Sequence, residues 1–190
     1  FQLRLAIDRA RANNMPAANI ERAIARAQGG SAQNIEEILY VAYGPQGVAI
    51  LIETATDNRN RAIASVKAVL NKFGGKLASA GAVQYLFDKK GEIVMEGKNE
   101  SDTEMDIIES GADDYEKEDN QYLVITPPAK ITDIKKWLEE KGYKIEDAKI
   151  VWQAKQTVSL NEEENEKLFK LLSTLDDLDD VTAVASNIGS

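Results

Sequence analysis

Apolar residues recur along the start of the chain at the three-to-four-residue spacing of amphipathic helices. This pattern predicts one helix over residues 2–12, a break at Asn13–Met15, and a second helix that begins near Pro16 and ends at Gly29–Gly30. A helical hairpin of this size is too small to be a complete domain. We therefore expect a further segment upstream of Phe1.

Two strands and a helix are predicted next. Residues 36–43 and 47–54 have the composition of strands, and Gly44–Gly47 joins them as a tight turn. The uncharged run Val48–Ile52 indicates a central strand that is buried on both faces of its sheet. Helical spacing of apolar residues predicts a helix over residues 58–73.

A second pattern begins at Gly91 and continues to about residue 156. The elements expected here are strands at 91–96, 114–117, 122–126 and 149–154, with one helix opened by a capping box at Ser101–Glu104 and another after Pro127–Pro128. Their order, β-α-β-β-α-β, is the split βαβ or ferredoxin-like arrangement. Such a unit can close its own sheet.

The rest of the chain predicts one discontinuous domain. A strand at Val83–Phe87 is left without a neighbour, and the terminal helix capped by Asn161 with a strand at 181–186 cannot stand alone. We therefore expect an α+β multidomain protein in which two α/β sandwich-like domains follow a truncated helical N-terminal domain. The expected domains are residues 1–33, residues 34–89 together with 157–190, and an inserted ferredoxin-like domain at residues 90–156.

The amino-acid composition excludes several kinds of catalytic and metal-binding site. The chain contains no cysteine and no histidine, so it has no Cys or His nucleophile, no His general base and no Cys/His zinc site. No spaced carboxylate pair is suited to acid–base work, and Asp176–Asp180 is typical of a solvated turn. We expect no catalytic activity, no metal and no cofactor. No apolar run approaches the roughly 20 residues that span a bilayer, so a membrane partner is not expected.

Charge is distributed unevenly along the chain. The net charge of −9 divides into +5 over residues 1–90 and −14 over residues 91–190, and all seven arginines precede the first lysine, Lys67. Arginine recognises phosphate in a planar, bidentate manner. The arginine-rich first third is therefore where we expect a polyanion, although ordinary surface charge would give the same division.

The helix that starts at Asp57 or Asn58 carries Arg59 and Arg61 in its first turn. The helix dipole repels cations there, at a cost of about 0.3–1 kcal/mol each. A capped helix with two exposed arginines is one interpretation; an anion site formed by free backbone N–H groups and the arginines is the other. The candidate nucleic-acid-binding residues are Arg4, Arg11, Arg22, Arg26, Asn58, Arg59, Arg61, Lys67, Lys72 and Lys76.

Seven short segments together carry a family resemblance. They are RLAIDRA (4–10), NMP (14–16), NIERAI (19–24), YGPQGVA (43–49), TDNRNR (56–61), KFGG (72–75) and VQYLFDKKG (83–91). The set resembles the YebC family. The resemblance implies a helical N-terminal domain and two α/β domains, one of which interrupts the other, and a basic N-terminal segment that this chain lacks. It also implies DNA-binding transcriptional regulators, with some members acting in translation, including a mitochondrial activator.

Two functions therefore remain open. One is a non-enzymatic, DNA-binding transcriptional regulator in which the acidic inserted domain faces away or meets a protein. The other is a ribosome-associated translation factor that binds rRNA or mRNA. Phosphate contacts carry no sequence information, so residue types do not separate the two. We expect a cytoplasmic protein if the source is bacterial and a mitochondrial one if it is eukaryotic.

Overall fold

The structure is a computed structural model that describes residues 6–7, 17, 21, 24 and 35–189. The two helices predicted before Gly30 fall largely outside these residues, although every described position within them is helical. The remaining described residues form two compact units. We call residues 35–88 with 152–189 the discontinuous unit and residues 89–151 the inserted unit.

The discontinuous unit is built on a four-stranded antiparallel sheet with the order β3-β1-β2-β8. Its strands are β1 (Glu36–Tyr43), β2 (Ala49–Thr56), β3 (Lys76–Leu77) and β8 (Val181–Ser186). Between β1 and β2 lies the turn η1 (Pro45–Gly47), in which Gln46 and Gly47 adopt positive φ angles of 58° and 77°. The tight turn expected between the first two strands is therefore confirmed.

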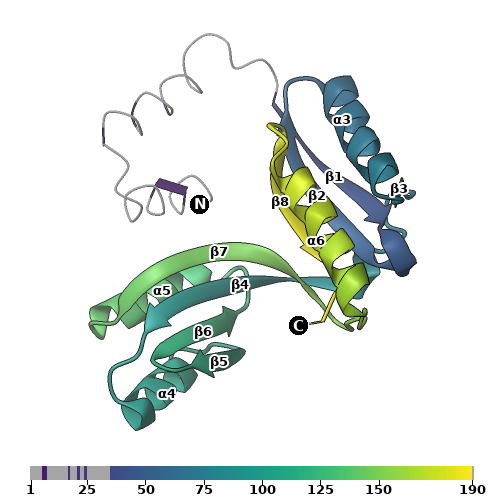
Figure 1. Ribbon diagram of the computed structural model, residues 1–190. Coiled ribbons are helices and arrows are strands. Elements are labelled where there is room, and N and C mark those ends of the chain that lie inside the picture. The colour runs from purple at the N-terminus through teal and green to yellow at the C-terminus, as the bar shows by residue number, and fades with distance from the viewer. Residues whose placement is uncertain (1–5, 8–16, 18–20, 22–23, 25–34, 190) are drawn as a thin grey trace. The chain divides into compact units, whose positions relative to one another are not determined.

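Two helices, α3 (Arg59–Lys72) and α6 (Glu162–Asp176), lie next to each other against one face of this sheet (Figure 1). Each turns a stripe of buried residues inward: Ala62, Val66 and Leu70 from α3, and Leu168, Leu171 and Leu175 from α6. These side chains meet Ile50 and Ile52 of β2 in one core. The periodicity of apolar positions therefore fixes which face of each helix is buried.

The opposite face of the sheet is also covered. Leu51 of β2 is buried there with Val83 and Phe87, and Trp152 packs against the same cluster. The indole Nε1 of Trp152 donates a 2.9 Å hydrogen bond to Glu53. Strand β2 is thus buried on both faces, as the run Val48–Ile52 predicted.

The predicted strand at Val83–Phe87 is wrong. Gln84–Leu86 form a 3₁₀ turn, η2, and strand β4 begins only at Phe87. Val83 and Phe87 are spaced four residues apart, so a single helical turn places both on its buried side, at 1% and 3% exposure. In so short a segment, helical spacing and strand alternation are not distinguishable.

The inserted unit has the predicted order β-α-β-β-α-β. Its elements are β4 (Phe87–Glu96), α4 (Glu100–Glu109), β5 (Asp114–Glu118), β6 (Gln121–Thr126), α5 (Ile131–Glu140) and β7 (Lys144–Ala154). The strands form a second four-stranded sheet with the order β5-β6-β4-β7. Together with the first sheet, this establishes an α+β protein with two four-stranded antiparallel sheets.

One face of the second sheet packs against its two helices. The core contains Ile93 and Met95 of β4, Ile107 of α4 and Leu138 of α5, each at most 1% exposed. Gly91 lets α5 approach β4, because a Cβ at this position would lie 3.0 Å from the Ile131 side chain and would also clash with the Thr126 hydroxyl of β6. This close approach accounts for a glycine inside a strand.

The capping box predicted at Ser101–Glu104 is not the start of α4. The helix begins at Glu100 with Asn99 as its N-cap, and the Asn99 side chain makes no capping hydrogen bond. Instead, the hydroxyl of Thr103 accepts a 3.1 Å hydrogen bond from the backbone N–H of Lys98. The predicted cap of α6 is confirmed: Asn161 and Glu164 exchange side-chain-to-backbone hydrogen bonds of 2.9 and 3.1 Å.

Candidate nucleic-acid interface

The start of α3 is organised by Asn58. Its side-chain oxygen accepts a hydrogen bond of 3.1 Å from the backbone N–H of Arg61, and its own N–H donates to the Thr56 hydroxyl at 3.0 Å. Asn58, and not Asp57, is therefore the N-cap residue. The carboxylate of Asp57 therefore does not cap the helix and can form other contacts.

Arg61 is held by two carboxylates of the same chain. Its guanidinium donates to Asp57 at 2.8 Å, and to Asp180 through Nη2 at 2.6 Å and Nε at 3.1 Å. Hydrogen bonding to Asp180, and then to Asp57, raises the pKa of Arg61. The same contact with Arg61 holds the pKa of Asp180 below its usual value. Asp180 precedes β8, so this cluster joins the start of α3 to the start of β8.

Arg61 therefore has partners within the chain at the helix N-terminus. The sequence suggests that an external anion offsets the unfavourable dipole, but Asp57 and Asp180 already provide negative charge within hydrogen-bonding distance. The sequence could not reveal this partner, because Asp180 lies 119 residues from Arg61.

Arg59 has a different environment. It is exposed in the first turn of α3, and no described carboxylate forms an ion pair with it. Its charge acts on Tyr40, whose pKa is raised by burial while Arg59 opposes that rise. Among the described residues, the buried Tyr40 hydroxyl has no hydrogen-bond partner. Arg59 thus keeps the unfavourable position that the sequence indicated for both arginines.

The other predicted cations of this region are also exposed. Lys67 and Lys72 lie on α3, and Lys76 lies on β3. The Lys72 Nζ sits 5.3 Å from the centre of the Phe73 ring. Within the described part of the chain, none of the three lysines forms a salt bridge. We refer to Arg59, Lys67, Lys72 and Lys76 as the α3 cation set.

The sequence of α3, RNRAIASVKAVLNK, contains four cations and no carboxylate. The inserted unit differs, because many of its lysines are matched to carboxylates. Examples are the pairs Lys90–Asp113 at 2.7 Å, Lys141–Asp106 at 2.9 Å and Lys144–Glu96 at 2.7 Å. The α3 cation set is therefore positive charge that the described structure leaves uncompensated.

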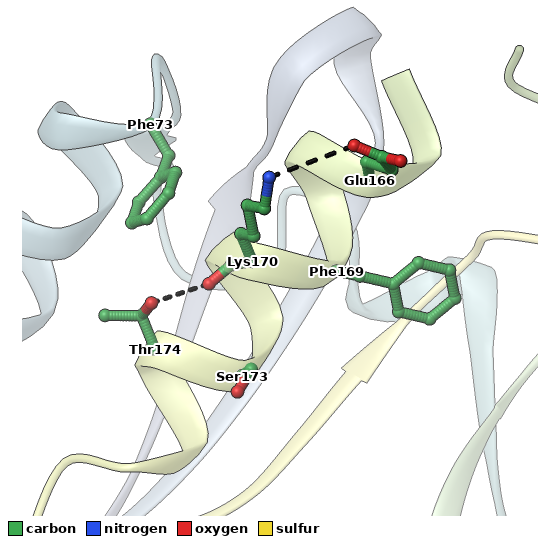
Figure 2. A pocket seen from close by; sticks show the side chains of 6 residues that line it. All are labelled: Phe73, Glu166, Phe169, Lys170, Ser173 and Thr174. Carbon is green, nitrogen blue, oxygen red and sulfur yellow. Dashed lines mark hydrogen bonds and ion pairs between the residues drawn. The ribbon is translucent and has the colours of Figure 1, made fainter. Parts of the chain in front are cut away.

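A shallow groove of about 530 Å³ lies beside this helix in the discontinuous unit. It is lined by Phe73, which follows α3, and by outward-facing residues of α6: Glu166, Phe169, Lys170, Ser173 and Thr174 (Figure 2). No motif in the sequence marks this groove. Phe169 is the signal that could have revealed it, because this residue lies off the Leu168, Leu171 and Leu175 stripe of its helix.

Four candidate residues, Arg4, Arg11, Arg22 and Arg26, lie outside the described residues. The candidate residues that the structure describes are the α3 cation set, Asn58 and Arg61. The part of the chain that is described contains no group of three or more carboxylates arranged to hold a metal ion. None of its helices is long and apolar enough to cross a membrane.

The family model for the second and third domains of TACO1/YebC proteins matches residues 35–188, and the model for the TACO1/YebC N-terminal domain matches residues 1–30. The chain belongs to the TACO1/YebC family. This confirms the resemblance seen in the seven short segments. The match covers both described units of this family member.

Relatives of the chain are similar over nearly its whole length. A protein of Caldanaerobacter subterraneus is 42% identical, covering 98% of this chain and 79% of the relative, and one of Nitrosococcus oceani is 45% identical, covering 98% and 76%. Both are named "Probable transcriptional regulatory protein". The YebC family is a non-enzymatic family of probable transcriptional regulators, which confirms the prediction of a non-enzymatic chain.

A solved structure has the same fold. The crystal structure of a conserved hypothetical protein from Aquifex aeolicus superposes with a TM-score of 0.88 at 38% identity, and the match covers 98% of this chain and 78% of that protein. The multidomain architecture of this YebC-family chain is thus shared with a relative of known structure.

Proposed function

We propose that this YebC-family protein is a DNA-binding transcriptional regulator that grips the nucleic-acid backbone with the α3 cation set. The observation that carries the proposal is the absence of any carboxylate on α3, beside cations that have no salt bridge among the described residues. Each cation that neutralises a phosphate releases a counterion, and this release provides most of the non-specific affinity for DNA. The names of the relatives support the regulatory role.

Within this proposal the two arginines have separate roles. Arg59 contacts phosphate directly and Asn58 shapes the helix start, where free backbone N–H groups favour an anion. Arg61 supports the site by fixing the α3 start to Asp180, while part of its guanidinium stays exposed at the rim. Arg4, Arg11, Arg22 and Arg26 remain further candidates for contacts with phosphate.

We also infer a three-domain organisation and a cytoplasmic location in a bacterium. The domains are a helical one at residues 1–33, a discontinuous α/β domain at 34–89 and 157–190, and a ferredoxin-like insertion at 90–156. The family-model matches at residues 1–30 and 35–188 support the first boundary. The bacterial relatives support the location.

A ribosome-associated translation factor is the second candidate. It is favoured by the acidity of the inserted unit, which contains 17 acidic residues and ten lysines over residues 89–151. Such a unit would suit the basic proteins of a ribosome, while the same α3 cations would contact rRNA. The unit is equally able to remain in solvent while α3 binds DNA.

A competition experiment distinguishes the two functions. The DNA-regulator proposal predicts that a specific site, selected from genomic fragments, outcompetes bulk DNA by at least roughly a thousandfold at physiological salt. The binding of this chain to DNA and its co-sedimentation with ribosomes are measured in parallel, each with and without competitor DNA. If competitor abolishes DNA binding at every fragment while co-sedimentation persists, the translation factor replaces the DNA regulator.

A further inference from the structure

The groove beside α3 exposes aromatic surface that the fold does not use. Phe169 is 60% exposed, although Leu168 on the same helix is fully buried. Phe73 is half-buried and reaches the groove from the end of α3. Figure 2 shows the two rings on opposite sides of the outward face of α6, with Lys170 between them. Isolated apolar side chains on a surface are common, but here two aromatic rings border one depression.

Two lysines, Lys72 and Lys170, lie near the aromatic residues of the groove. The Lys72 Nζ lies 5.3 Å from the centre of the Phe73 ring, and Lys170 reaches Glu166 only at 3.9 Å. Both side chains of the Lys170–Glu166 pair are 70% exposed, so solvent screens this contact and leaves Lys170 available for another anion. Among the residues that line the groove, Glu166 is the carboxylate and Lys170 is the cation, while Lys72 lies over the Phe73 ring.

We propose that the groove binds single-stranded nucleic acid, with bases stacked on Phe73 and Phe169 and the connecting phosphates held by Lys72 and Lys170. This inference rests on the proposed nucleic-acid function. It adds that the groove binds single strands in preference to duplexes. Stacking on aromatic rings beside a positive track is how proteins bind single strands without reading sequence. The Ser173 hydroxyl and the Glu166 carboxylate provide further groups for hydrogen bonds to base edges.

The kinds of side chain in the groove favour a single strand over other occupants. In a duplex the faces of the bases are already covered by their neighbours, so Phe73 and Phe169 could not stack on them. An amphipathic helix from a protein needs a continuous apolar stripe in its groove, whereas the charged Lys170 stands between the two rings. Two separate rings with a cation between them offer stacking surface and positive charge together, which is the combination that a single strand uses.

Fluorescence anisotropy with the full chain tests this proposal. The probes are a labelled single-stranded oligonucleotide of about 12 nucleotides, within the site size of such grooves, and a duplex of the same sequence. Phe169→Ala should weaken binding of the single strand about 5- to 150-fold, the loss expected for one stacked base, and leave binding of the duplex unchanged. Phe169→Trp, which preserves stacking, should retain the affinity of the original chain.

Met105 provides a matched control. It is 58% exposed on α4 of the inserted unit, so Met105→Ala removes a similarly exposed apolar side chain that does not line the groove and should not change either affinity. Because Phe169 is exposed, thermal melts of all variants should superpose, which separates binding from folding.

Three results would overturn the stacking proposal. The first is equal binding of the single strand by Phe169→Ala and the original chain. The second is full binding by Phe169→Leu, which keeps apolar area but has no ring. Either result would leave the proposed nucleic-acid function intact, since the original chain still binds. The third is failure of the original chain to bind both probes, which would reject the proposed function and the stacking proposal together.

Discussion

At the scale of single residues, the Arg61 cluster shows how the chain offsets a cation at a helix N-terminus. Asp57 is four residues before Arg61 and is available from the sequence, but the shorter contact is made by Asp180. The side chain of Asp180 is only 13% exposed, whereas that of Asp57 is 39% exposed. The less exposed pair is less screened by salt, so Asp180 is the partner that most affects stability.

The pH dependence of stability tests this role of Asp180. Arg61 lowers the pKa of Asp180 in the folded protein, so the carboxylate contributes stability above its ordinary pKa of about 3.9 and loses it as the pH falls through the lower folded value. We expect Asp180→Asn to lower the melting temperature at pH 7, and the difference from the original chain to shrink below about pH 4.

The measurement is a series of thermal melts from pH 7 to pH 3. Asp179→Asn is the matched control, because Asp179 is the exposed neighbour of Asp180 and forms no salt bridge within the described residues. A pH-independent difference for Asp180→Asn would show that the Arg61 contact does not stabilise the fold through its charge.

At the scale of elements, the two N-caps differ in a way that predicts stability. Asn161 and Glu164 form a reciprocal capping box at the start of α6, whereas the Asn99 side chain makes no capping hydrogen bond at the start of α4. Asn161→Ala should therefore lower the free energy of unfolding by about 1 kcal/mol, and Asn99→Ala by much less. Urea denaturation of both variants measures the difference. Equal destabilisation would mean that the contribution of an N-cap residue to the free energy of unfolding depends on residue type and not on the observed hydrogen bond.

Much of the element pattern could be predicted from the sequence. Strand β1, the central strand β2 and helices α3, α5 and α6 each have a long periodic segment bounded by a glycine, proline or cap residue. Strand β3 could not be recognised because it has only two residues. Strands β4 and β7 are longer than predicted, since charged residues at 88–90 and at 144, 146 and 147 interrupt the hydrophobic pattern inside them.

The candidate site could be predicted from the sequence less completely than the helices and strands. Local sequence was enough to place Arg59, Lys67 and Lys72 on one helix and to predict a cap at its start. It could not show that Arg61 is paired and Arg59 is not, because the deciding carboxylate belongs to another element. The groove escapes prediction for the same reason, since Phe73 and Phe169 come from different helical segments.

At the scale of the whole molecule, the net charge and the local charge of α3 have opposite signs. The net charge of −9 gives no indication of nucleic-acid binding, yet α3 has four cations and no carboxylate. Overall negative charge keeps a protein from collecting on every polyanion, while a local positive element still attracts phosphate at short range because salt limits the reach of the remaining charge to about 8–10 Å. The proposed function requires that DNA binding depend on the cations of α3.

The salt dependence of DNA binding is the most direct measurement of that claim. In the triple variant Arg59→Gln, Lys67→Gln, Lys72→Gln, the slope of log affinity against log salt should become shallower by about 2.7, or about 0.9 for each phosphate that is no longer neutralised. The control is Lys136→Gln, Lys141→Gln, Lys144→Gln, which removes the same charge from salt-bridged lysines of the inserted unit and should leave the slope nearly unchanged. Equal slopes for the α3 variant and the original chain would contradict the account.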